Sequence, residues 1–280
     1  MSALLEVDDV TKDFVVGPPL RRTTFPAVKG VSLRIEAGSS YGLVGESGSG
    51  KTTVARMVAQ LTRPTSGAIR FDGVDTTGLK GRRLLEFRRN VQMVFQDPYG
   101  ALNPRMTVLQ LVSEPWEVHR LHTSADRRRR AAALLDKVGL PSSALERKPV
   151  EFSGGQRQRI MIARALALEP RLIVADEPVS ALDVSVQAQV LNLLKDLQEE
   201  LGLSYLFISH NLSVVEFVSD RIGVMLLGDL VEEGDRESIY RSPRTEYTRR
   251  LLDAIPALPE PGGRRGEARE ADEGSLVHDR

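Results

Sequence analysis

Apolar and polar positions along the chain alternate in two distinct rhythms. Residues 3–14 and 31–37 are predicted strands, and over 31–37 apolar side chains recur at every second position, which is typical of a half-buried strand. Further strands are predicted at residues 41–44, 67–72, 91–96, 172–175, 205–209 and 221–227. A helix is predicted at 51–61, and another carries apolar residues with a period of 3.6 from Val186 to Leu201, with Gly202 as its C-cap.

Strand signals are missing between residues 98 and 168, where the sequence is helical in character. The pattern therefore predicts an α/β core interrupted by a helical insertion. After Pro256 the chain is rich in proline, glycine and mixed charge and nearly free of apolar residues. Such a composition cannot bury enough apolar surface to fold, so residues 257–280 are predicted to be a disordered tail.

Composition excludes several classes of protein. The 280 residues contain 38 Lys and Arg against 38 Asp and Glu, which disfavours a nucleic-acid binder that works by phosphate neutralisation. Cysteine is absent, so disulfide scaffolds, Cys-ligated metals and a Cys nucleophile are excluded. The sequence shows neither a bilayer-spanning segment nor a signal peptide, and we expect a cytoplasmic protein that touches a membrane only through a partner.

A glycine-rich segment lies between the strand predicted at 41–44 and the helix predicted at 51–61. It fits the pattern G-x-x-x-x-G-K-[ST] and comprises Gly45, Glu46, Ser47, Gly48, Ser49, Gly50, Lys51 and Thr52, with Thr53 next in the helix. Its glycines let the backbone wrap around phosphate, and the helix adds its positive end. In this pattern the lysine reaches the β- and γ-phosphates and the threonine hydroxyl ligates Mg²⁺. A simple Gly/Ser-rich turn would need neither Lys51 nor Thr52.

Two adjacent carboxylates, Asp176 and Glu177, end the apolar run at 172–175. In a phosphate-binding site Asp176 can hold magnesium through water, and Glu177 can polarise an attacking water as a general base. Taken alone, the pair could be a solvated acidic turn. Together with the glycine-rich segment it predicts the second half of a nucleotide site.

The branch of nucleotide-binding proteins is decided by residues 152–156, Phe-Ser-Gly-Gly-Gln. This segment resembles the signature motif of ATP-binding cassette (ABC) proteins. Ser153 is a good N-cap, and Gly154 and Gly155 leave the helix amides uncovered, which suits a second anion site. The resemblance implies that this helix, with Gln156, meets the γ-phosphate of ATP bound to a partner cassette. A P-loop kinase would leave the segment unexplained, and the guanine-reading motif of GTPases is missing.

Other positions match the family residue by residue. Gln96 looks like the Q-loop glutamine, a magnesium ligand and sensor of the helical insertion, and His210 looks like the switch histidine that contacts the γ-phosphate. Asp183 lies in what looks like the D-loop at the dimer interface. Phe14 is the preferred residue for stacking on adenine, and Phe25 is its competitor. The resemblance thus implies Lys51, Gln96, Glu177 and His210 as catalytic residues, and Thr52, Gln96 and Asp176 around the metal.

Several segments narrow the resemblance to the ATPases of dipeptide and oligopeptide importers, notably residues 95–107, 181–188 and 242–252. It implies a P-loop NTPase with a RecA-like core, an antiparallel β subdomain and an inserted helical subdomain. The implied domains are a cassette at 1–240, with the helical subdomain at 98–168, and a short importer-type extension at 241–256. The implied cofactors are ATP and Mg²⁺.

The implied partners are a second ATPase subunit of the same or a paralogous chain, two membrane permease subunits and, indirectly, a solute-binding protein, but no nucleic acid. This places the chain at the cytoplasmic face of the cell membrane. Tyr99 and Leu102 are predicted to be exposed in a groove after Gln96 that receives a permease helix. The alternatives are a soluble cassette ATPase acting on DNA or ribosomes, and an exporter cassette normally fused to membrane spans.

Overall fold

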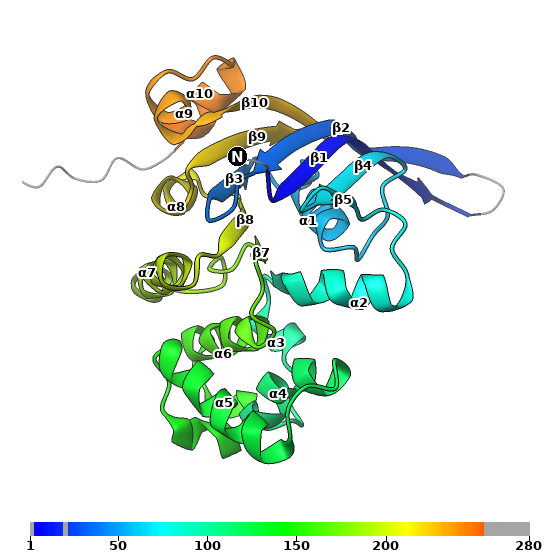
Figure 1. The fold of residues 1–280 in the computed structure, drawn as a ribbon. Coiled ribbons are helices and arrows are strands. Elements are labelled where there is room, and N and C mark those ends of the chain that lie inside the picture. Colours follow the sequence, from blue (N-terminus) through cyan, green and yellow to red (C-terminus); the bar gives the residue numbers. More distant parts are fainter. Residues whose placement is uncertain (1–2, 19–21, 255–280) are drawn as a thin grey trace, which may run out of the picture.

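The computed structural model describes residues 3–18 and 22–254, which form two sheets with helices around them (Figure 1). The smaller sheet has the order β2-β1-β4-β5, and its described pairs are antiparallel. Its strands are β1 (Leu5–Val16), β2 (Thr23–Ile35), β4 (Ser66–Phe71) and β5 (Val74–Asp75). Its strands lie at the upper right of Figure 1.

The larger sheet has six strands in the order β10-β9-β3-β8-β7-β6. Its strands are β3 (Ser40–Val44), β6 (Val91–Val94), β7 (Leu172–Asp176), β8 (Ser204–Ser209), β9 (Arg221–Leu226) and β10 (Asp229–Asp235). They run parallel except β10, which pairs antiparallel with β9. The carboxyl ends of β6, β7 and β8 therefore meet at one edge, and this edge carries the candidate site.

Burial of both faces explains the continuous apolar runs of the parallel strands. Along β7, Leu172 and Val174 join one buried cluster, whereas Ile173 and Ala175 join the other. The first cluster also contains helix α1 (Lys51–Val58) and core residues of the antiparallel sheet, so α1 packs between the two sheets. The second cluster joins the opposite face of the larger sheet to the helical insertion.

Helices fill the chain between β6 and β7. They are α3 (Pro98–Ala101), α4 (Val108–Val118), α5 (Ser124–Lys137) and α6 (Gly154–Leu166), with 3₁₀ turns at Ser142–Glu146 and Pro149–Glu151. Thr107 and Thr123 cap α4 and α5 with their hydroxyls. The other helices are α2 (Gly81–Asn90), α7 (Val184–Leu201), α8 (Leu212–Val218), α9 (Arg236–Arg241) and α10 (Glu246–Asp253).

Several elements differ from the sequence prediction, and strand β10, for example, is not predicted at all. The second strand begins at Thr23 and not near residue 31, although Pro26 interrupts its pattern. Proline is tolerated there because β2 is an edge strand, where a missing N–H costs no ladder hydrogen bond. The sequence pattern also gave no helix at α2, which buries only Phe87 and so lacks an apolar periodicity.

The predicted α/β class, with an antiparallel sheet and an inserted helical part, is confirmed. Within residues 3–18 and 22–254, no helix is both long and apolar enough to cross a membrane. The tail predicted at 257–280 lies outside the described residues, and the domain boundaries remain predictions.

Candidate functional site

The glycine-rich loop joins β3 to α1 in a conformation that depends on glycine at both ends. Gly45 has φ +149°, and a Cβ there would lie 2.2 Å from the carbonyl oxygen of Met225. Gly50 has φ +105°, and a Cβ would lie 2.5 Å from the carbonyl oxygen of Ala27. Any other residue would push the loop off the two sheets against which it packs.

The Lys51 side chain lies inside this loop. Its ammonium donates to the carbonyl oxygens of Gly45 at 2.7 Å and Glu46 at 2.8 Å, and to Ser49 Oγ at 3.3 Å. Burial lowers the pKa of the Lys51 ammonium, while the carboxylates of Glu177 and Asp176 oppose that shift. The loop thus holds a desolvated cation beside its glycines, which suits a phosphate.

Thr52, on the first turn of α1, faces the end of β7. Its hydroxyl donates to Asp176 Oδ1 at 3.0 Å. Asp176 is buried, and burial raises the pKa of its carboxyl above the usual range, with the Thr52 hydrogen bond opposing the shift. A hydroxyl and a carboxylate side by side are hard oxygen ligands of the kind that Mg²⁺ prefers.

Glu177 brings together the ends of three neighbouring strands. Its backbone N–H donates to the carbonyl oxygen of Ile208 at 2.9 Å, and its φ is +47°, a left-handed conformation that is uncommon outside glycine. Its Oε2 accepts a hydrogen bond from Gln96 Nε2 at 3.0 Å and lies 3.1 Å from His210 Nδ1. The structure therefore assembles Gln96, Glu177 and His210 beside the phosphate-binding loop.

The signature segment lies apart from this assembly. Ser153 caps α6, accepting from the Gln156 N–H at 3.3 Å, while the Gln156 side chain accepts from the Ser153 N–H at 3.1 Å. Gly155 packs so closely on α7 that a Cβ would lie 2.3 Å from Val186 Cγ1. Asp183 caps α7 through the Val186 N–H at 3.0 Å. No hydrogen bond within residues 3–18 and 22–254 joins residues 153–156 to the phosphate-binding loop.

The two candidates for stacking on adenine turn out to be neighbours. Phe14 on β1 pairs directly with Phe25 on β2, so the two side chains share one face of the hairpin. They are 39% and 55% exposed. The Lys12 ammonium lies 5.2 Å from the centre of the Phe14 ring. The two alternatives therefore stand next to each other on one face and could hold the base together.

The groove expected around Tyr99 and Leu102 is wrong in one of its two residues. Leu102 is only 1% exposed and belongs to the core. Asp97 caps the short helix α3, and Leu102, directly after that helix, points inward. Tyr99 is exposed, with the Arg157 guanidinium 4.0 Å from its ring centre.

A groove of about 200 Å³ lies instead between β6 and the helical insertion. It is lined by Leu61, Met93, Phe95, Pro115, Met161 and Arg164, among others. Phe95 stands directly before Gln96, so the groove is continuous in the chain with the candidate site.

One contact to the loop was missed in the sequence. The hydroxyl of Tyr247, on α10, accepts a hydrogen bond from the backbone N–H of Glu46 at 3.2 Å. The resemblance of residues 242–252 to an importer extension was the available signal, but it assigned Tyr247 no contact.

A glycine-rich loop closed on its lysine, an acid pair at the end of the adjoining sheet and a separate capped Gly-Gly helix define a P-loop ATPase of the cassette class. The chain belongs to the ABC transporter family, whose pattern it matches over residues 28–180. Members of this family hydrolyse ATP, and the chain is an ATPase of this kind.

Similar proteins agree with this assignment. The chain is 51% identical over 269 residues to the oligopeptide transport ATP-binding protein OppF of Bacillus subtilis (strain 168), covering 95% of this chain and 87% of that protein. It is 52% identical over 244 residues to a putative peptide import ATP-binding protein of Brucella ovis, BOV_A0347, covering 87% and 77%.

Solved structures share the fold. The dimeric ATP-binding cassette MJ0796, bound to ADP and Pi, has a TM-score of 0.73 and 32% identity, covering 83% of this chain and 98% of that chain. The protein cbiO1 from Clostridium perfringens, part of an ABC transporter complex, has a TM-score of 0.74 and 25% identity, covering 91% and 97%.

Proposed function

We propose that this chain is the ATP-hydrolysing subunit of an importer for dipeptides, oligopeptides or related small solutes. The observation that carries the proposal is the identity of 51% to a Bacillus subtilis oligopeptide transport protein, which extends over 95% of the chain. A likeness this long includes the C-terminal extension as well as the cassette. It favours transport over a soluble ATPase acting on DNA or ribosomes.

In this proposal residues 45–53 hold the phosphates of ATP, and Phe14 with Phe25 holds the base. The fit to Mg²⁺ comes from the oxygens of Thr52 and Asp176, which lie 3.0 Å apart. Within the described residues no three His, Asp or Glu side chains cluster as a metal site. Magnesium usually takes one or two carboxylates together with substrate phosphates, so this sparse set suits a metal that arrives with the nucleotide. The ion would neutralise charge on the phosphates.

Glu177 is proposed as the general base for the attacking water. Gln96 and His210 both contact its Oε2, which orients the carboxylate, and the other oxygen has no hydrogen bond among the described residues. We place His210 at the γ-phosphate and Gln96 between the site and the helical insertion. The predicted role of Gln96 as a metal ligand also remains a proposal, since its amide here bonds to Glu177.

The separation of residues 153–156 from the chain's own loop favours a site shared by two cassettes. We infer that Ser153, Gly154, Gly155 and Gln156 of one subunit complete the phosphate site of the other, with Asp183 at the interface. The MJ0796 cassette is described as dimeric. The second subunit here is the same chain or a paralogue.

The groove beside Phe95 is proposed to receive a short cytoplasmic helix of one permease subunit, and the same groove of the second cassette would receive that of the other permease subunit. These contacts would hold the ATPase at the cytoplasmic face of the membrane. The groove touches both the core strand β6 and the insertion helices α4 and α6. A helix bound there would respond to relative movement of β6 and the insertion helices, and Gln96 would transmit that movement to Glu177. A solute-binding protein would act outside the cell, without touching this chain.

A double substitution in the groove tests the proposal. Leu61→Ala with Phe95→Ala should lower uptake of a labelled tripeptide by cells and release the ATPase from membranes, while the purified chain keeps its ATP affinity. The matched control is Leu201→Ala with Phe217→Ala, because these residues are comparably exposed and lie outside the groove.

Normal uptake and membrane attachment in the groove variant would contradict the permease site. Deletion of the whole gene, under conditions in which it is expressed, should abolish uptake of at least one peptide. Unchanged uptake of peptides from two to five residues long would contradict the solute assignment.

A further inference from the structure

The phosphate-binding loop contacts the C-terminal extension on the side away from Lys51. The peptide group between Gly45 and Glu46 is held at both ends: its carbonyl accepts from Lys51 Nζ at 2.7 Å and its N–H donates to the Tyr247 hydroxyl at 3.2 Å. The Tyr247 side chain is buried, since the residue is only 8% exposed. A peptide group fixed in this way cannot rotate without breaking both bonds.

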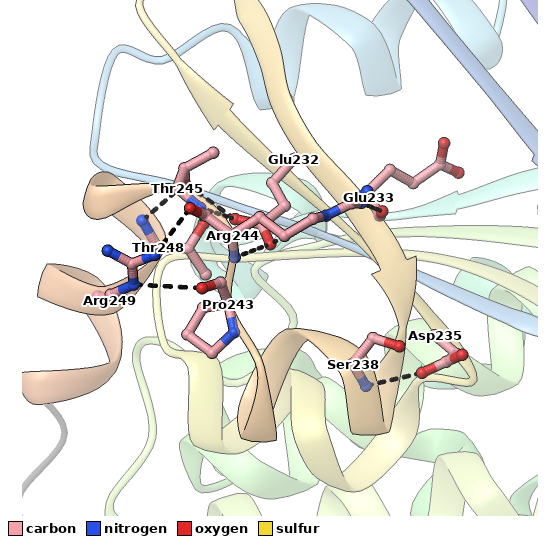
Figure 2. Close-up of polar contacts among 9 residues, drawn as sticks. All are labelled: Glu232, Glu233, Asp235, Ser238, Pro243, Arg244, Thr245, Thr248 and Arg249. Carbon is pink, nitrogen blue, oxygen red and sulfur yellow. Dashed lines mark hydrogen bonds and ion pairs between the residues drawn. The ribbon is translucent and has the colours of Figure 1, made fainter.

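Helix α10, which carries Tyr247, is anchored to the sheet by a single carboxylate (Figure 2). Glu232 on β10 is 5% exposed. Its Oε1 accepts from the Arg244 N–H at 2.7 Å, and its Oε2 accepts from the Thr245 N–H at 3.0 Å and the Thr245 hydroxyl at 2.9 Å. All three bonds come from the turn between α9 and α10.

The same turn continues into the first residues of α10. The Thr245 hydroxyl accepts from the Thr248 N–H at 3.1 Å, which caps the helix, and lies 2.8 Å from the Thr248 hydroxyl. Arg249 closes the turn from the other side by donating to the carbonyl oxygen of Pro243 at 3.2 Å (Figure 2). The start of α10, which carries Tyr247, is thus held by hydrogen bonds that run from Glu232 through Thr245 to Thr248.

A second contact shows that the loop is supported from the C-terminal side along its length. The Gly228 N–H, in the turn between β9 and β10, donates to the carbonyl oxygen of Ser49 at 3.0 Å. Glu46 and Ser49 are therefore both held by the segment that runs from β9 to α10. That segment includes none of the nucleotide-contacting residues that the motifs predict.

We propose that Tyr247 is a positioning residue for ATP, which holds the Gly45–Glu46 peptide group in the orientation that places the Lys51 ammonium, and that Glu232 locks Tyr247 in place. The C-terminal extension then contributes to ATP binding by supporting the phosphate-binding loop. This role concerns ATP binding and does not depend on which solute is carried.

The test uses the full-length chain with Tyr247→Phe, Glu232→Gln and Tyr240→Phe. Tyr247→Phe removes the hydroxyl that accepts from the Glu46 N–H. Glu232→Gln replaces one carboxylate oxygen with an amide N–H₂ group, which then faces the N–H and hydroxyl donors of Arg244 and Thr245. Tyr240→Phe is the matched control, because its hydroxyl donates to the Leu212 carbonyl, away from the loop. Three experiments are made: amide hydrogen exchange of residues 45–50 without nucleotide, equilibrium binding for the Kd of ATP, and steady-state hydrolysis for the KM and kcat of ATP.

Tyr247→Phe should speed exchange in residues 45–50 and raise the Kd and KM for ATP about 2- to 10-fold, the range expected for one lost hydrogen bond. Its kcat should stay within about twofold of the parent, since Glu177 and its partners are untouched. Glu232→Gln should show the same pattern, together with faster exchange throughout α10. Tyr240→Phe should leave exchange in the loop and the KM unchanged.

Unchanged loop exchange and unchanged ATP affinity in both Tyr247→Phe and Glu232→Gln would overturn the proposal. It would also be overturned if Tyr240→Phe altered the loop as strongly as Tyr247→Phe does, since the effect would then reflect general loosening. If Tyr247→Phe does not fold, Glu232→Gln decides between these outcomes by the same three measurements.

Discussion

Glu177 directly follows β7 and Glu232 lies on β10 of the same sheet, yet their surroundings are opposite. Glu232 is enclosed, and its two oxygens accept three hydrogen bonds from Arg244 and Thr245. Glu177 uses a single oxygen, for Gln96 and His210, and its Oε1 has no hydrogen bond or ion pair among the described residues.

The difference shows how a fold assigns one residue type to two tasks. Burial alone would raise the pKa of Glu232, but the donated hydrogen bonds lower it to about 2, so this carboxylate cannot take up a proton near neutral pH. It can only hold structure. Glu177 has a left-handed backbone and one carboxylate oxygen without a partner among the described residues, and this arrangement suits the general base that we propose.

The largest effect is expected from removing the base. Glu177→Gln keeps the size of the side chain and removes its basicity, so turnover of ATP should fall by about 10²–10⁴-fold while ATP still binds. Steady-state hydrolysis and equilibrium binding measure the two quantities. Glu232→Gln is the counterpart and should retain kcat to within a few-fold. Hydrolysis at the parent rate in Glu177→Gln would show that another group is the base.

The next effect concerns association. In the Glu177→Gln background bound ATP persists, so ATP should shift the chain towards dimers in size measurements, whereas Glu232→Gln alone should show no such shift. Adding Gly154→Asp should block the shift, by placing a carboxylate against the γ-phosphate. Gly154 suits this test because its Cβ would meet only Leu182 Cδ2, at 3.2 Å. Equal dimer content with and without Gly154→Asp would contradict the shared site.

A smaller effect is expected on stability in acid. The Glu232 pKa falls from 4.5 to about 2 in the folded chain, so its contribution to stability is full above pH 4.5 and is lost as the pH falls towards 2. Glu232→Gln should lower the free energy of unfolding by about 1–3 kcal/mol at neutral pH, because buried donors lose a partner. Urea titrations should show a smaller difference in the free energy of unfolding between the parent and Glu232→Gln at pH 3 than at pH 7. An equal difference at both values would argue against the ionised network.

The smallest effect should be a gain. Burial raises the folded-state pKa of Asp176, so its charge disfavours the fold; this cost grows as the pH rises above the unfolded-state pKa of 3.8 and levels off above the folded-state pKa. Asp176→Asn should therefore raise the free energy of unfolding at pH 7 by about 0.5–1 kcal/mol in the absence of nucleotide, a gain typical of relieved functional sites. Binding of MgATP should weaken in the same variant. Lower stability would mean that Asp176 is chiefly structural.

The edge of the larger sheet that carries the candidate site was predictable, because its residues stand at the ends of strongly patterned elements. Lys51, Asp176 and Glu177 each end or begin an element with a strong pattern, and parallel strands bring their carboxyl ends together. The contacts of Gln96 and His210 with Glu177 follow from the order of β6, β7 and β8. The roles of these residues remain predictions, but their proximity is a property of the fold.

The Glu232 network was not predictable by the same means. β10 pairs only with β9 and carries charged residues, so its pattern resembles a turn. The three donors come from a turn whose position depends on the packing of two short helices. Leu102 was missed for a similar reason: its burial depends on the turn that Asp97 caps, and no apolar periodicity in the sequence indicates it.

In the proposed nucleotide site Phe14 and Phe25 hold the base, and this bears on which nucleotides the chain accepts. Stacking uses the π-face that every base has, and two phenyl rings offer no donor or acceptor to the edge of a base. A platform of this kind senses that a flat aromatic base is present and is indifferent to the substituents that distinguish adenine from guanine. Selection of ATP over GTP would then rest on cellular concentration, and a purified chain should accept both.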